Sequence, residues 1–103
     1  ELAEEAGLAA GEWREALRME MSNSVTDERA IAWLAWALTP VPVAPDPTEI
    51  IRSVRVPFTD LLAEIGRGSV RDAFTVATTL RAYHMAREGD LPARLAQAML
   101  GRV

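Results

Sequence analysis

The sequence predicts an all-α fold, a compact bundle of five or six helices around one buried central helix. Three observations support this prediction. One stretch is entirely apolar between a helix-start and a helix-stop residue, other segments space their apolar residues three and four apart, and several Ser, Thr and Asp residues stand at N-cap positions. At 103 residues the chain is expected to form a single helical domain over residues 1–103.

The central helix is predicted over about residues 26–39. Every residue from Ala30 to Leu38 is apolar, Thr26 is placed as an N-cap, and Pro40 prevents the helix from continuing. A helix that is apolar on all sides is expected to be buried. This run is far shorter than the roughly 20 residues that cross a bilayer, so we expect burial within protein and no membrane partner.

Residues 2–21 space their apolar side chains three and four apart, which predicts an amphipathic helix. Gly7 and Gly11 interrupt the pattern, and two interpretations stay open. Either one helix contains two weak positions, or a short helix ends at Gly7 and a second runs from about residue 9 to residue 21. The second interpretation has the spacing of a helix-turn-helix corner, a DNA-binding arrangement.

The charge of this segment disfavours nucleic acid as a partner. The second helix would present Glu12, Glu15 and Glu20 to the phosphates, whereas DNA binding depends on neutralising them. The second half of the chain is more basic, and its candidate contacts for an anion or polyanion are Arg52, Arg55, Arg67 and Arg71. A helix-turn-helix-like DNA- or polyanion-binding regulatory module is therefore the alternative functional hypothesis.

The middle of the chain is rich in proline. Residues 40–47 contain four Pro, which predicts a stiff, extended crossover connection inside the domain. Residues 46–49 resemble a helix start, with Asp46 as the cap and Pro47 in the first turn. The segment 50–56 is left open between helix and strand, because its last residues alternate between apolar and charged.

Three further helices are predicted in the second half. Thr59 caps a short helix over residues 60–65, which Gly66 and Gly68 close. A capping-box pattern over residues 69–72 opens the longest helix, about residues 70–88, and Asp90 with Pro92 begins the last one. The turn before the longest helix is interpreted as a cap, in preference to an anion site.

The residue inventory gives no support to catalysis. The chain contains no Cys, which excludes disulfides and thiolate metal sites. Its one histidine, His84, provides no ligand set for a metal and is expected to pack or to pair with Glu88. Nucleophile and phosphate-binding motifs are also missing. We therefore predict no catalytic residue, no cofactor and no metal.

The tryptophans point to an interaction function. The candidate partner interface consists of Trp13, Met19, Met21, Trp33 and Trp36. Core packing is the alternative explanation for these residues. The sequence predicts a non-catalytic, cytoplasmic interaction or assembly domain, an adaptor or structural subunit that binds a protein partner or forms a homo-oligomer. Because the chain begins at Glu1, it is expected to be part of a longer one.

Overall fold

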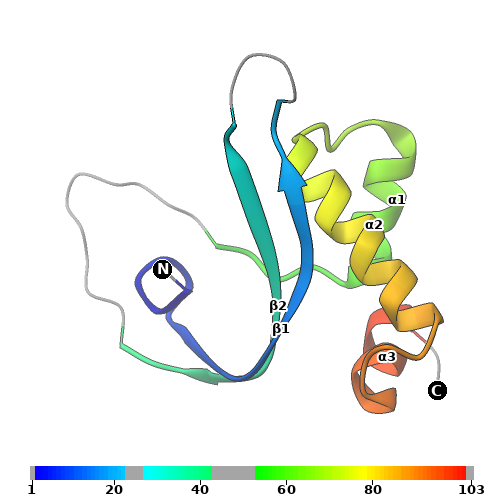
Figure 1. The fold of residues 1–103 in the computed structure, drawn as a ribbon. Helices are drawn as coiled ribbons and strands as arrows, with labels where there is room; N and C mark the ends of the chain where they lie inside the picture. The colour runs from blue at the N-terminus through cyan, green and yellow to red at the C-terminus, as the bar shows by residue number, and fades with distance from the viewer. Residues whose placement is uncertain (1, 23–26, 43–52, 102–103) are drawn as a thin grey trace. The chain divides into compact units, whose positions relative to one another are not determined.

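The computed structural model describes residues 2–22, 27–42 and 53–101 (Figure 1). Its elements in chain order are η1 (Leu2–Ala6, a π-helical turn), β1 (Leu8–Glu20), β2 (Arg29–Pro40), α1 (Phe58–Arg67), α2 (Ala73–Arg87) and α3 (Ala93–Leu100). β1 and β2 pair as a two-stranded antiparallel hairpin. The fold is a mixture of strands and helices, so the prediction of an all-α bundle of five or six helices is wrong.

The predicted central helix is replaced by strand β2. From Arg29 to Leu34 the side chains alternate between exposed and covered, with Ala32 only 1% exposed and Trp33 53% exposed. This alternation is the signature of a strand with one face on a core and one on solvent. A continuous apolar run has no periodicity of its own, which is why the sequence did not distinguish a strand from a buried helix here.

Strand β1 likewise replaces the predicted amphipathic helix, and only the short turn η1 is helical before it. Gly7, with a φ of 66°, separates the two elements. Ala, Glu, Leu, Arg and Met favour helices, but by less than about 1 kcal/mol per residue, and pairing with β2 outweighs that preference. The predicted helix-turn-helix corner is therefore wrong.

The hairpin register is fixed at both ends. Near the turn the Met21 N–H donates to the Glu28 carbonyl at 3.0 Å, and at the other end the Val41 N–H donates to the Gly7 carbonyl at 2.9 Å. Between these bonds β1 contains one residue more than β2, with 13 residues against 12. One residue of β1 is therefore accommodated in a β-bulge.

The three helices expected in the second half are present, with shifted starts. α1 follows Pro57 directly and ends at Gly68, whose φ of 80° is left-handed. α2 begins at Ala73 because Asp72 caps it, and not within residues 69–71 as predicted. Residues 53–57 form neither helix nor strand, and residues 46–52 lie outside the described ranges. In the described parts of the chain, α1–α3 are all too short to cross a membrane.

The chain divides into two compact units. The smaller unit contains Glu1–Arg14 and Ala35–Arg55, and in it the Arg14 guanidinium stacks over Trp36 at 5.7 Å. The larger unit contains Glu15–Leu34 and Val56–Val103. Its core joins the hairpin to the helices through Ala16, Ala32, Met85, Ala86 and Leu91.

Candidate interaction site on the hairpin

The candidate site is the solvent-facing side of the hairpin near its turn, in the larger unit. The Met21–Glu28 bond places Arg18 opposite Ile31, and side chains two residues apart along a strand share a face. Five exposed side chains meet on this side, which we call the hairpin face: Arg18, Glu20, Arg29, Ile31 and Trp33.

The opposite side of the same strands is already used by the core. Leu17 and Met19 of β1, and Ala32 and Leu34 of β2, pack against side chains of α2 and α3. This packing fixes which side of the hairpin meets solvent, because a shift of one residue would exchange the two sides. The hairpin face is thus presented by a supported strand pair.

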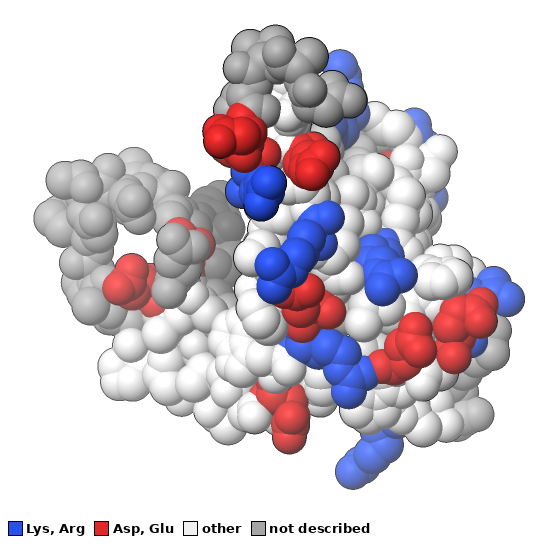
Figure 2. All heavy atoms as spheres, viewed as in Figure 1, with Lys and Arg blue, Asp and Glu red and all other residues white. Residues whose placement is uncertain are grey.

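The hairpin face combines exposed apolar area with charge. Trp33 is 53% exposed and Ile31 43% exposed, although both are large apolar side chains. A hollow of about 510 Å³ lies at this end of the hairpin and is lined by residues from both of its sides: Arg18, Met19, Glu20, Arg29, Ala30 and Ile31. Figure 2 shows arginine and acidic side chains interspersed over this part of the molecule. Such a mixture of aromatic, aliphatic and arginine side chains is typical of protein-binding surfaces.

The two arginines of the hairpin face differ in their surroundings. Arg18 pairs with Glu15 three residues earlier in the chain, with a guanidinium–carboxylate distance of 2.9 Å. The side-chain hydrogen bond to Glu15, together with its negative charge, raises the pKa of Arg18 above its ordinary value. For Arg29 no ion pair is found with any residue in the described ranges. Arg29 is therefore the cation of this face that is available to a partner.

Helix α2 fixes the hairpin from the side. The Arg81 Nε donates a hydrogen bond of 2.9 Å to the backbone carbonyl of Ala16, in a partly buried position. The bond connects residues 65 positions apart in the chain, so no local sequence pattern predicts it. It holds the outer edge of β1 against α2.

The structure divides the predicted interface residues between different environments. Trp33 lies on the hairpin face, Met21 is 44% exposed where β1 ends, and Met19 packs against the core. Trp13, 53% exposed, and Trp36, half-buried beneath Arg14, belong to the smaller unit.

Sequence reasoning missed the other four members of the hairpin face: Arg18, Glu20, Arg29 and Ile31. Their common signal is a period of two along each strand, which becomes readable only when the segments are treated as strands. A helical reading distributes the same residues around a cylinder. The missed residues are therefore a direct consequence of the wrong secondary structure.

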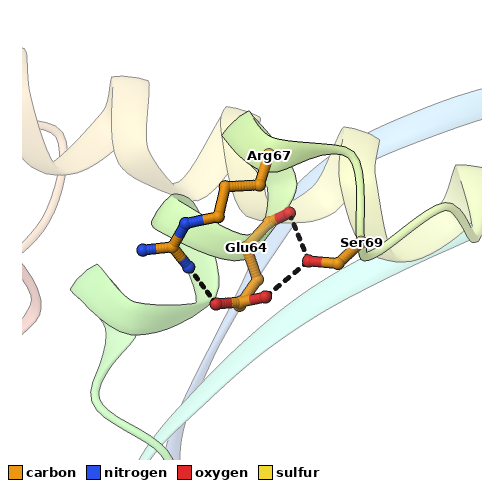
Figure 3. A network of polar contacts seen from close by, with 3 residues as sticks. All are labelled: Glu64, Arg67 and Ser69. Atoms are coloured by element: carbon orange, nitrogen blue, oxygen red, sulfur yellow. Dashed lines mark hydrogen bonds and ion pairs between the residues drawn. The ribbon is translucent and has the colours of Figure 1, made fainter.

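Three of the four candidate anion contacts lie among the described residues, and each has different surroundings. Arg67 pairs with Glu64 of its own helix, and the same carboxylate accepts a hydrogen bond from the Ser69 hydroxyl (Figure 3). Arg71 is exposed between α1 and α2, Arg55 belongs to the smaller unit, and Arg52 lies outside the described residues. Their role as anion or polyanion contacts stays a prediction.

Among the described residues, the histidine and the carboxylates form no metal-binding cluster. His84 is exposed in the last turn of α2, and the Glu88 N–H bonds to its backbone carbonyl at 2.9 Å. Among the described residues, no group of three His, Cys, Asp or Glu side chains is arranged to hold a metal ion. The hairpin face is consequently the best-supported candidate site in the described parts of the chain.

Comparison of the chain with protein-family models, with curated proteins and with solved structures finds no match.

Proposed function

We propose that this chain is a non-catalytic interaction or assembly domain that binds a protein surface through the hairpin face. One observation supports the proposal above all others. Trp33 and Ile31 stay about half exposed on a hairpin whose other side already supplies the core. Large apolar side chains held outward on a supported strand gain free energy when a partner covers them, at about 25 cal/mol for each Å² removed from water.

The charged neighbours suit such a contact. Tryptophan and arginine are the side chains that contribute most often to binding hot spots, and Arg29 lies two positions from Ile31 on the same strand. Charges around an apolar centre mainly direct the approach and orientation of a partner. The partner is a protein surface, either another copy of this chain or a different subunit. We also propose a cytoplasmic location, which the absence of Cys favours.

The proposal is tested by measuring the solution mass of the chain by light scattering across a wide concentration range. We expect the mass to rise above the monomer value of 11.3 kDa as the concentration increases. For Trp33→Ala the mass should rise only at protein concentrations at least ten times higher than for the natural chain, while the circular dichroism spectrum stays unchanged. Tenfold corresponds to about 1.4 kcal/mol, a modest loss for an interface tryptophan.

Trp13→Ala is the matched control, because Trp13 has the same exposed fraction of 53% but belongs to the smaller unit. It should leave the concentration dependence of the mass unchanged. A chain that stays monomeric at every concentration, with Trp33→Ala only lowering its stability, would contradict assembly through this face.

A further inference from the structure

The backbone of β2 has two edges with different surroundings. In an antiparallel pair, residues alternate between those whose backbone groups bond to the opposite strand and those whose groups point outward. The bond from Met21 to Glu28 sets this alternation near the turn. Counting along β2 from Glu28, the residues with outward backbone groups are Arg29, Ile31 and Trp33. Opposite Ile31 on β1, the backbone groups of Arg18 point outward at the other edge.

The outer edge of β1 is covered by helix α2. The Ala16 carbonyl accepts the 2.9 Å hydrogen bond from Arg81 of α2. For β2, no backbone bond joins Arg29, Ile31 or Trp33 to any described residue outside the hairpin. Figure 1 agrees, since β1 lies next to α2 and β2 forms the far side of the hairpin in the larger unit. Among the described residues of the larger unit, the Arg29–Trp33 part of β2 is therefore an open edge of the sheet.

We infer that this open edge pairs with the same edge of a second copy, antiparallel and centred on Ile31. The two hairpins then form one four-stranded sheet whose two-fold axis passes between the two Ile31 residues. The inference rests on the proposed interaction function and specifies its partner and its geometry. An extended strand is the occupant that an edge selects, because only a strand matches its alternating donors and acceptors.

Charge complementarity selects a second copy in this register. Centring on Ile31 places Arg29 opposite Trp33 of the second copy, and Trp33 opposite the second copy's Arg29. A guanidinium beside an indole is a favourable cation–π pair, and the chain already contains one between Arg14 and Trp36. Centring on Arg29 instead would oppose two guanidinium groups, which is unfavourable across strands.

The symmetry of the contact closes the assembly at two copies. A two-fold contact uses the same patch on both chains, so it leaves no edge free to recruit a third copy there. Pairing the three outward residues of each strand forms about six backbone hydrogen bonds. The same pairing places Ile31 and Trp33 of each copy against side chains of the other copy, which covers part of their exposed area.

Single cysteines test the register, since the natural chain contains none. Directly opposed residues of this kind lie about 5.5 Å apart between Cα atoms, within the range that a disulfide spans. Ile31→Cys should therefore form a disulfide-linked dimer under mild oxidation at low protein concentration. Arg29→Cys alone and Trp33→Cys alone should form no such disulfide. In this register each residue lies about 13 Å along the strand from the same residue of the second copy. A mixture of these two variants should cross-link.

Light scattering on the unmodified chain separates the two possible failures. If the chain self-associates but Ile31→Cys stays unlinked, or Arg29→Cys links to itself, the edge pairing is overturned and the proposed function stands. If the chain stays monomeric, the proposed self-assembly fails as well.

A second variant guards against effects on folding. Ile31→Lys places a charge at the centre of the edge, where the side chain is already exposed. Its circular dichroism should match that of the natural chain. Its dimer should form only at protein concentrations at least ten times higher than those at which the natural chain dimerises. An Ile31→Lys chain that dimerises as tightly as the natural one overturns the inference.

Discussion

Single residues decide where the helices begin and end, and Asp72 shows this best. Its carboxylate accepts the Thr75 N–H at 2.9 Å and the Thr75 hydroxyl at 2.7 Å, which caps α2. These two hydrogen bonds lower the pKa of Asp72, the side-chain bond contributing most. Ser69, the cap expected from sequence, instead donates to Glu64. The carboxylate is the stronger acceptor at a helix N-terminus, and it defines the start.

The Asp72 cap should make stability depend on pH. Because the folded pKa lies below the ordinary aspartate value, the cap contributes fully above that ordinary value. Its contribution is lost as the pH falls through the lowered one. Asp72→Asn keeps a capping oxygen without this titration, so its urea midpoint should fall less than that of the natural chain between pH 7 and pH 2. Parallel pH profiles for the two chains would rule this role out.

Gly66 and Gly68, at the end of α1, allow a controlled comparison of two glycine-to-alanine substitutions. Gly68 has a φ of 80° and Gly66 lies inside α1, and an added Cβ would meet nothing within 4 Å at either position. Gly68→Ala should destabilise the chain by about 1–2 kcal/mol, the cost of a left-handed non-glycine residue. Gly66→Ala should stabilise it by up to about 1 kcal/mol. Urea unfolding measures both, and equal effects would contradict the left-handed cap.

At the scale of elements, the hairpin depends on a bond from a helix distant in sequence. Arg81→Met keeps much of the apolar stem but removes the donor to the Ala16 carbonyl. We expect a loss of about 1.5–3 kcal/mol in the free energy of unfolding, the usual range for a charged donor. The control is Arg71→Met at an exposed position between α1 and α2, which should change stability by less than about 0.5 kcal/mol. Equal effects of the two variants would show that Arg81 does not hold the hairpin.

The secondary structure predicted from the sequence was wrong in the first half of the chain, where the structure has strands. Residues 57–101 contain local signals that act within a few positions, such as Pro57, Gly68 and Gly101 at helix ends. Residues 8–40 contain helix-favouring residues with few local stop signals. Strand pairing is a non-local interaction, and no single segment of sequence encodes it. The helices were therefore predictable and the hairpin was not.

At the scale of the larger unit, small side chains set the spacing between hairpin and helices. Ala32, 1% exposed, and Ala86, 5% exposed, both lie in its core. Ala32→Leu should cost about 1–3 kcal/mol, because a close-packed core does not accept the added volume without strain. Ala63→Leu, at an exposed position of α1, should be nearly neutral. Thermal unfolding compares the two, and a neutral Ala32→Leu would contradict close packing at this contact.

The sequence by itself determined the helices of the second half, the glycine that ends α1, and the candidate status of Trp33. Each depends on capping, backbone conformation or residue type, which act locally. Only the tertiary structure decided that residues 8–20 and 29–40 pair as strands and that Trp33 shares a face with Ile31 and Arg29. It also decided that Trp13 and Trp36 lie in another unit. The reason is physical: which side of an apolar segment is buried depends on what packs against it, and that partner lies far away in the chain.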